Sequence, residues 1–273
     1  MTSLLSTVVR VALATAVLLT ASPSVAMAQG RGAGPAQPEP GPIRRLPDGT
    51  PDISGLYQAN AGGANYGLER QTGPRTMWPP SRGVVVDPPD GRLPLQPWAR
   101  QEATDRQQPA RGYDDPTAHC LPGGIPRSHY VPSPFHILQT PGSIVVLYER
   151  MSWRSIPLDG RAHVPDDIRL WMGDSVGRWE GDTLVVETTN FNGKTWLNEW
   201  GDIITHDLKV VERFTPVNAD TITYQATLTD PLAYTRPFTI EMPFNRMDGE
   251  LLEVACHEDN QDLQHMRDVK EGL

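Results

Sequence analysis

The fold class is decided by one stretch, Trp179-Glu180-Gly181-Asp182-Thr183-Leu184-Val185-Val186-Glu187-Thr188. Gly-Asp is a tight-turn dipeptide, and the β-branched run after it is typical of a strand. The stretch therefore predicts a β-hairpin in which Gly181 has a positive φ. Outward from this hairpin, Thr221 to Thr229 alternates polar residues with Ile222, Tyr224, Ala226 and Leu228. A period of two predicts a strand with one apolar face.

Similar apolar runs predict further strands at Asp52–Tyr57, Val84–Val86, Ile144–Glu149, Ser155–Leu158, Ile168–Met172, Lys209–Phe214, Phe238–Met242 and Leu251–His257. Only Pro97 to about Gln107 is typical of a helix, with proline at its first position. Because consecutive strands joined by short turns make an antiparallel meander, we expect an all-β fold. The meander should close as a lipocalin-like β-barrel, with long irregular N-terminal loops and at most one or two short helices.

The N-terminus has the order of features found in a secretory signal peptide. Arg10 precedes the apolar run Val11–Leu19, and Ala26-Met27-Ala28 supplies a small-residue cleavage site. We therefore predict a signal peptide at residues 1–28, a Gly- and Pro-rich flexible linker at 29–50 and one barrel domain at 51–273. The expected location is the periplasm or the medium.

Charge and composition limit the partners. The formal net charge is −9, and the 24 Lys and Arg residues form no basic stripe, so neither nucleic acid nor a membrane surface is an expected partner. No Gly-rich loop follows a strand and opens a helix, so we expect no nucleotide and no other cofactor. The expected partner is a small-molecule substrate or ligand.

The chain has two cysteines, Cys120 and Cys256. In an exported protein a distant pair of this kind predicts a disulfide. The alternative is a zinc site, because His119 and His257 are the immediate neighbours of the two cysteines. Adjacent residues on a strand point to opposite faces, which favours the disulfide.

Several segments together suggest relatives. They are His119-Cys120-Leu121-Pro122, Leu158-Asp159-Gly160-Arg161 and Ser175 to Thr188. With these segments the chain resembles a large group of secreted bacterial proteins of unknown function, over about residues 50 to 265. The resemblance implies no activity, cofactor or catalytic residue. The hairpin segment is also similar to strands of lipocalin-like barrels, which implies architecture alone.

Candidate catalytic residues gather around the turn Asp159-Gly160-Arg161-Ala162-His163. A short turn places a carboxylate, a guanidinium and an imidazole at one end of the barrel. Arg161 would hold a substrate oxyanion while His163 moves a proton. Glu149 and His206 are further candidates for acid–base work. The alternative is an ordinary Asp-Gly turn whose arginine bonds backbone carbonyls.

A pocket for a planar or sugar-like ligand is predicted from the tryptophans crowded into the same half of the chain. The expected substrate-binding residues are Trp153, Arg154, Trp171 and Trp196. The alternative is that these tryptophans belong to the core.

Two other motifs are weaker. Gly173-Asp174-Ser175-Val176-Gly177 satisfies the G-x-S-x-G pattern, but a hairpin follows it where a serine hydrolase needs a helix. The glycines therefore indicate a bend. His129, His136 and His163 with Glu149 match no standard metal-ligand spacing, so we expect no metal.

The leading hypothesis is an exported enzyme that performs hydrolysis or elimination by His/carboxylate acid–base chemistry in a barrel pocket. The long irregular region of residues 60–130 would cap that pocket. One alternative is a non-catalytic periplasmic carrier or sensor of a small apolar or sugar-like ligand, which needs an apolar cavity. Another is an interaction module, which predicts a filled interior. An enzyme should instead bring at least two titratable groups within hydrogen-bond reach.

Overall fold

The computed structural model describes residues 41–71, 81–150 and 152–273. The predicted signal peptide and residues 29–40 of the predicted linker lie outside the described residues. Residues 41–50 of that linker contact the barrel, because Arg45 forms an ion pair with Asp182 at 2.7 Å.

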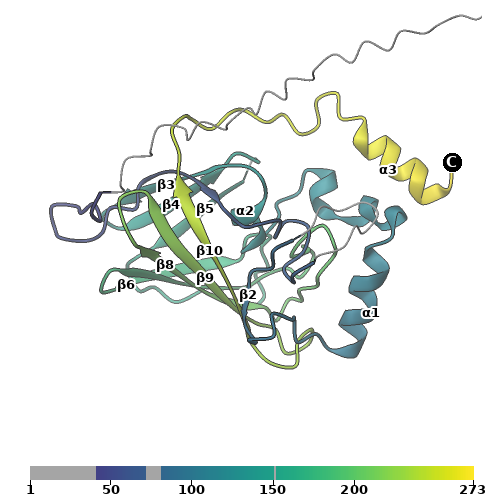
Figure 1. Cartoon of the computed structure of the whole chain (residues 1–273), viewed down its shortest axis with the longest axis horizontal. Coiled ribbons are helices and arrows are strands. Elements are labelled where there is room, and N and C mark those ends of the chain that lie inside the picture. Colours follow the sequence, from purple (N-terminus) through teal and green to yellow (C-terminus); the bar gives the residue numbers. More distant parts are fainter. Residues whose placement is uncertain (1–40, 72–80, 151) are drawn as a thin grey trace, which may run out of the picture. The chain divides into compact units, whose positions relative to one another are not determined.

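The architecture is a nearly closed antiparallel β-barrel, as the hairpin pattern predicts (Figure 1). Its strands are β1 (Gly55–Ala59), β2 (Val85–Asp87), β3 (Phe135–Thr140), β4 (Ser143–Tyr148), β5 (Ser152–Pro157), β6 (Asp174–Glu180), β7 (Thr183–Thr189), β8 (Lys209–Pro216), β9 (Thr221–Thr229) and β10 (Phe238–Arg246). Around the barrel the order is β5-β4-β3-β1-β10-β9-β8-β7-β6, and β2 pairs with β10 beside this path. The barrel is therefore an up-and-down meander whose first and last strands, β1 and β10, pair with each other.

The barrel opens along one seam, between β5 and β6. All hydrogen-bonded neighbours on the path are antiparallel, and the path has nine strands. An odd number of strands cannot alternate in direction all the way round, so β5 and β6 run the same way. Side chains bridge the seam instead, since Arg154 Nε donates to Ser175 Oγ at 2.9 Å.

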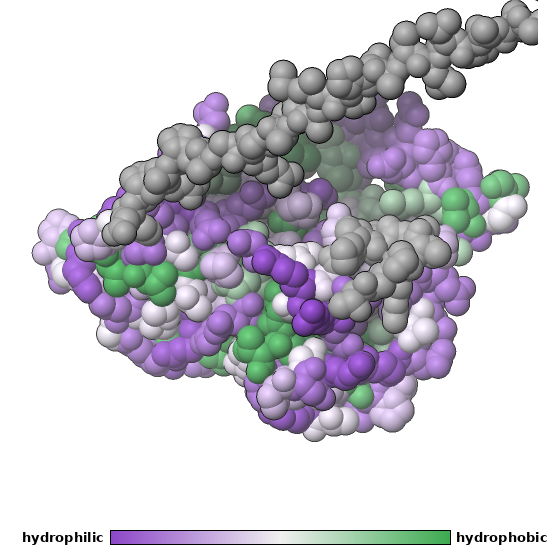
Figure 2. Space-filling model, in the orientation of Figure 1, coloured by the Kyte–Doolittle hydropathy of each residue, from purple (hydrophilic) through white to green (hydrophobic). Residues whose placement is uncertain are grey.

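The strand patterns have the predicted physical basis. In β9 the four apolar residues are at most 1% exposed, while the threonines between them are half-buried. Burying a side chain of the size of Ile222 or Leu228 contributes about 1.5 to 3 kcal/mol. Gly181 has φ +61°, and the register pairs Glu180 with Thr183, so the β6–β7 loop has two residues. On the surface shown in Figure 2, small hydrophobic groups lie among mainly hydrophilic residues.

Two predicted strands were wrong. Ile168–Met172 forms only an isolated bridge at Leu170, and Leu251–His257 is irregular. Both segments are exposed or half-buried, and apart from Met172, which packs against the core, their apolar residues lie outside it. The sequence pattern also missed β3. Its two neighbours in the barrel are β1, which lies far earlier in the chain, and β4, which follows it directly.

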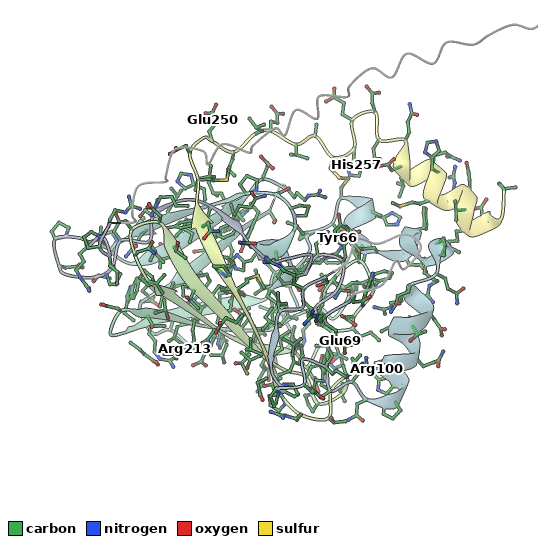
Figure 3. The ribbon with its side chains drawn as sticks, in the orientation of Figure 1. Tyr66, Glu69, Arg100, Arg213, Glu250 and His257 are labelled. Atoms are coloured by element: carbon green, nitrogen blue, oxygen red, sulfur yellow. A yellow bond between two sulfur atoms is a disulfide. The ribbon has the colours of Figure 1, made fainter. Side chains whose placement is uncertain are left out.

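Short helices gather at one end of the barrel, which we call the helix end: the end at which β4, β7 and β9 finish. They are α1 (Pro97–Arg106), the 3₁₀ helices η1 (Pro109–Asp114) and η2 (Pro116–His119), α2 (Arg127–Tyr130) and α3 (Asp262–Glu271). Arg100 of α1 pairs with Glu69 at 3.2 Å (Figure 3). Among the described residues, no helix combines the length and apolar character needed to cross a bilayer.

The predicted disulfide is confirmed. Cys120 and Cys256 are bonded, with their Cα atoms 5.8 Å apart. The zinc alternative is therefore wrong, since neither thiol is free. The bond ties the C-terminal segment to the end of η2, and Lys270 of α3 makes a second tie by bonding Asp114 of η1 at 2.5 Å.

Candidate functional site

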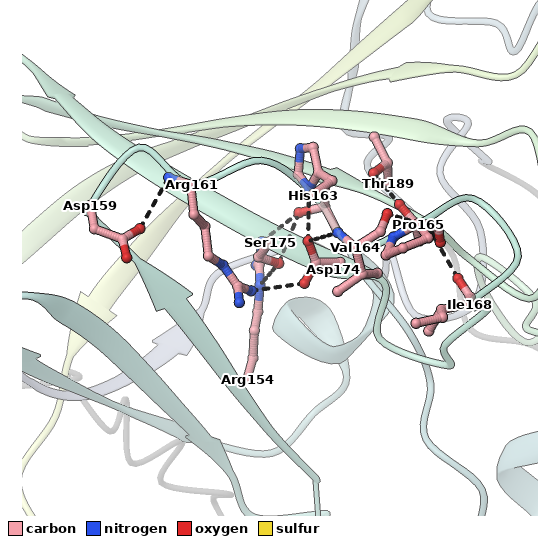
Figure 4. Close-up of polar contacts among 12 residues, drawn as sticks. Arg154, Asp159, Arg161, His163, Val164, Pro165, Ile168, Asp174, Ser175 and Thr189 are labelled. Atoms are coloured by element: carbon pink, nitrogen blue, oxygen red, sulfur yellow. Dashed lines mark hydrogen bonds and ion pairs between the residues drawn. The ribbon is translucent and has the colours of Figure 1, made fainter.

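Asp174, the first residue of β6, gathers the polar groups of the β5–β6 connection. Because β5 and β6 are parallel, residues 158–173 must return along the height of the barrel before β6 begins. Arg161 Nη2 donates to Asp174 Oδ1 at 2.9 Å, and His163 Nδ1 lies 2.9 Å from Asp174 Oδ2 (Figure 4). The Val164 amide also donates to Oδ2, at 3.3 Å. One carboxylate thus holds a guanidinium and an imidazole together.

Local hydrogen bonds explain why the connection adopts this path. The Asp159-Gly160 turn is closed by the Arg161 amide, which donates to Asp159 Oδ1 at 3.1 Å (Figure 4). Further on, the Asn190 side-chain amide donates to the carbonyls of Val164, Pro165 and Ile168, at 3.0–3.3 Å. Asn190 follows β7, so the loop is anchored to the barrel at the helix end.

Burial differs sharply within the cluster. Asp174 is buried, His163 is half-buried and Arg161 is exposed. The buried carboxylate is compensated by Arg161 and by the imidazole, and it restricts how both can move. When His163 Nδ1 donates to Asp174, the neutral ring carries its free lone pair on Nε2. His163 is then oriented as a general base, with Arg161 beside it as an anion-binding group.

His163 also lines a cleft at the helix end, with a volume of about 560 Å³. The other walls are the connection after β5, the end of β7, the start of β8 and the end of β9. The lining residues include Asp166, Arg169, Thr189, Asn190, His206, Asp207, Leu208, Lys209, Thr229 and Pro231. The cleft brings together two imidazoles, two basic side chains and two carboxylates, a mixture suited to polar ligands.

The structure brings together most of the predicted catalytic residues. Asp159, Arg161 and His163 lie on one loop, and His206 lines the same cleft as His163. Glu149 lies elsewhere: its Oε1 accepts from the Leu252 amide at 3.3 Å, beside the C-terminal segment.

The predicted substrate-binding residues are scattered. Trp153 is 65% exposed on the outer face of β5, and Trp171 is half-buried in the connection before β6. Trp196 is buried, and the guanidinium of Arg106 lies 4.8 Å from its ring centroid. Among the described lining residues of the cleft there is no tryptophan. Arg154 points into the barrel.

The barrel interior holds a buried ion pair between Arg154 and Glu212, with side chains 2% and 0% exposed. Arg154 Nη1 donates to Glu212 Oε1 at 3.0 Å, and its Nη2 bonds Oε2. Tyr224 Oη also donates to Oε1, at 2.9 Å. Burial alone would raise the pKa of Glu212, but Arg154 and the hydrogen bonds from His129 and Arg154 outweigh it and lower that pKa to about 2.

The side chain of His129, from α2, enters the barrel interior from the helix end. Its ring packs against five aromatic rings, those of Phe135, Tyr148, Phe214, Tyr224 and Phe244, with centroids 5.1–5.7 Å away. Its Nε2 lies 3.3 Å from both Glu212 Oε1 and Tyr148 Oη. Burial lowers the pKa of His129, which favours the neutral ring. The barrel interior is therefore filled by side chains.

The structure also bears on the G-x-S-x-G motif and on metal binding. Ser175 of the G-x-S-x-G segment is buried and bonds Arg154 and Thr188, so it is not displayed on a strand-to-helix turn. Gly177 faces the seam, where a Cβ would lie 2.7 Å from Ile156. Within residues 41–71, 81–150 and 152–273, no three His, Cys, Asp or Glu side chains come together as a metal site.

Comparison with known proteins identifies no relative: no family model, no curated protein and no solved structure matches the chain. The Asp174 cluster and the cleft beside it are therefore the features from which a function can be inferred.

Proposed function

We propose that this protein is an exported enzyme that performs hydrolysis or elimination on a small organic molecule in the cleft at the helix end. The main support for the proposal is the contact between His163 Nδ1 and Asp174 Oδ2, at 2.9 Å. The same histidine lines a cleft of about 560 Å³. Paired carboxylate and imidazole groups of this kind are a recurring acid–base arrangement.

Each residue has a separate role in this proposal. Asp174 fixes the ring of His163 and stabilises the imidazolium that forms when Nε2 takes a proton from water or from a substrate carbon. Arg161 lies on the same carboxylate as His163 and outside the described lining of the cleft, so its exposed guanidinium would bind the oxyanion or carboxylate of a substrate that extends from the cleft toward it. The proton on His163 then passes to the leaving group, which restores the neutral ring. His206, on the same cleft, is the second candidate for proton transfer.

The alternatives make different demands on the barrel. A carrier would hold its ligand in an apolar interior, but His129, the Arg154–Glu212 pair and the surrounding aromatic rings occupy that space. The filled interior agrees with an interaction module. The cleft favours the enzyme over that module, because a module needs neither a polar cleft nor a histidine held by a buried carboxylate.

Export to the periplasm or the medium is part of the proposal. The Cys120–Cys256 disulfide supports it, because disulfides persist in oxidising compartments. The proposed partner is a small polar molecule. The cleft carries Arg169 and Lys209 beside Asp166 and Asp207, which is a balanced charge and not a basic surface for nucleic acid.

The test is a metabolite screen with the purified mature protein, in which mass spectrometry follows consumption of each compound. For the compound that is consumed, His163→Gln should lower kcat by about 10²- to 10⁴-fold, the usual contribution of a general base. Asp174→Asn should lower kcat with little change in KM. His136→Gln is the matched control, because His136 lies on β3, outside the cleft, and should leave the rate unchanged. Equal rates for parent and His163→Gln would refute the assignment.

A second measurement needs no substrate. Imidazole ¹⁵N shifts distinguish the two neutral tautomers, and the contact with Asp174 predicts a proton on His163 Nδ1. Asp174→Asn should change the tautomer population of His163 and leave that of His136 unaltered. A proton found mainly on Nε2 in the parent protein would remove the basis for the proposed base.

A further inference from the structure

The cleft beside His163 is lined by charged residues of both signs, and two separate segments each supply one of each sign. Asp166 and Arg169 lie on the connection between β5 and β6, whereas Asp207 and Lys209 lie just before β8 and at its first position. All four residues are exposed, so a molecule in the cleft can reach them without any rearrangement of the core.

Arg169 joins the two segments. Its Nη1 donates to the backbone carbonyl of His206 at 2.9 Å, and His206 Nε2 lies 3.3 Å from Asp207 Oδ1. The guanidinium of Arg169 is therefore held beside the segment that carries Asp207 and Lys209. A neutral carbonyl occupies one of its five N–H groups and leaves its positive charge available to an anion.

The unlike charges of the cleft are not paired with one another. Across the part of the chain that the structure describes, the side chains of Asp166 and Lys209 form no ion pair, and Asp207 is paired only with the neighbouring imidazole. Elsewhere on the barrel, exposed charges neutralise each other: Arg178 and Arg236 each lie 2.6 Å from a carboxylate oxygen. The cleft therefore keeps groups of both signs free for a ligand.

We propose that the substrate of this cleft is a small zwitterion, a molecule with an ammonium group and a carboxylate, as in an amino acid or a dipeptide. This inference rests on the function proposed above, because it names the substrate class of the same cleft. Arg169 and Lys209 bind the carboxylate, and Asp166 and Asp207 bind the ammonium group. The cleft volume of about 560 Å³ lies in the range of small-molecule sites.

A ligand with a single charge fits this arrangement less well. An anion drawn to Arg169 and Lys209 is repelled by the two aspartates, and a cation meets the opposite combination. Salt screens such effects only beyond roughly 8 Å at physiological ionic strength, so charges that share one cleft act on the same ligand. A zwitterion can place each of its charges near groups of the opposite sign.

The test measures binding by NMR, with the mature protein in its oxidised form and glycylglycine as the probe. The amide shifts of Leu208 and Thr229, which both line the cleft, report the contact. Two derivatives each remove one charge: N-acetylglycylglycine keeps only the carboxylate, and glycylglycinamide keeps only the ammonium group. Each derivative should bind about fivefold more weakly than glycylglycine, the effect of one exposed ion pair.

Glycine is the amino-acid arm of the same test. Tighter binding of glycine than of glycylglycine identifies an amino acid as the substrate, and the reverse order identifies a dipeptide.

Charge-specific variants locate the two halves of the site. Lys209→Gln should weaken binding of glycylglycine and N-acetylglycylglycine by about fivefold, while glycylglycinamide binds as before or more tightly. Asp166→Asn should weaken binding of glycylglycine and glycylglycinamide, and spare N-acetylglycylglycine. Lys194→Gln is the matched control, because Lys194 is an exposed lysine outside the described lining of the cleft, and it should bind all three compounds as the parent does.

The inference is overturned if either singly charged derivative binds as tightly as glycylglycine, or if glycylglycine in large excess shifts neither amide. Both comparisons use the parent protein and need no variant to fold. Failure of the proposed function gives a different result: glycylglycine binds as expected, but no compound in the metabolite screen is consumed in a His163-dependent reaction. If the compound consumed carries one charge or none, the zwitterion is refuted and the acid–base role of His163 stands.

Discussion

Replacing Glu212 with glutamine tests how strongly the interior ion pair affects folding. The substitution keeps the shape of the side chain but removes the negative charge that faces Arg154. Because Arg154 is 2% exposed, its positive charge would then be buried without a counter-charge. Breaking a buried pair in this way usually destabilises a protein by about 3 to 5 kcal/mol.

The acidity of Glu212 gives an independent value. A pKa of about 2 in the folded chain, against 4.5 for an ordinary glutamate, corresponds to about 3 kcal/mol of stability. Since the folded pKa is the lower one, this stability is present above pH 4.5 and is lost as the pH falls from 4.5 toward 2. We therefore expect Glu212→Gln to lose about 3 kcal/mol at pH 7 and to lose less with falling pH below 4.5.

The assay is urea unfolding followed by tryptophan fluorescence, at pH 7 and at intervals down to pH 3. Arg154→Met is the companion single variant, and Arg154→Met with Glu212→Leu is the control. The double variant replaces both charges by apolar groups, so it should be more stable than either single variant, although the buried Tyr224 hydroxyl loses its acceptor at a cost of about 1 to 3 kcal/mol. If Glu212→Gln is as stable as the parent, the reasoning is refuted, since Arg154 would then have found water or another partner.

Three further predictions concern stability. Gly181→Val should destabilise the fold by about 1 to 3 kcal/mol, because φ is +61° at Gly181. Gly142→Val is the control and should change the thermal midpoint little, because Gly142 lies in open space at an ordinary φ. Equal thermal midpoints for Gly181→Val and the parent would contradict the proposed turn. Thiol counting on denatured, unreduced protein should find no free thiol, and replacing Cys120 and Cys256 by serine should remove about 5 kcal/mol by the chain-entropy model, so an unchanged urea midpoint would rule out that contribution. Burial raises the pKa of Asp202 to about 6, so the stability contributed by this group falls as the pH rises from 3.8 to 6. Asp202→Asn should raise the free energy of unfolding by up to about 3 kcal/mol at pH 7 and abolish that fall. A variant less stable than the parent at pH 7 would contradict this prediction.

Local patterns predicted the barrel strands well. In β9, each buried residue alternates with a half-buried one, so the sequence itself carries the periodicity. The turn at Gly181 needs only one residue with positive φ, which is also a local requirement. Apolar composition predicts a strand at Ile168–Met172, but its burial does not alternate, and it pairs only through Leu170, in an isolated bridge with Phe191. Leu251–His257 failed for the same reason.

The polar contacts were only partly predictable. Arg161 and His163 could be predicted as candidates because they directly follow the Asp159-Gly160 turn in the sequence. Asp174 is eleven residues from His163, and its role comes from the first position of β6 beside the returning connection. Glu212 is 58 residues from Arg154, and His129 enters the barrel from a helix of four residues. Such pairs depend on the closed barrel, which no short pattern contains.

The position of the candidate site follows from the number of strands. An even number of strands on the path would let direction alternate all the way round, and a tight hairpin could join β5 to β6. With nine strands, β5 and β6 run in the same direction, so residues 158–173 must return to the helix end before β6 can begin. That return places Arg161 and His163 against Asp174, the first residue of β6, and it places His163 along the cleft formed with β7, β8 and β9. At the seam β5 and β6 are not paired with each other, and the connection between them, residues 158–173, supplies the histidine and arginine of the proposed active site.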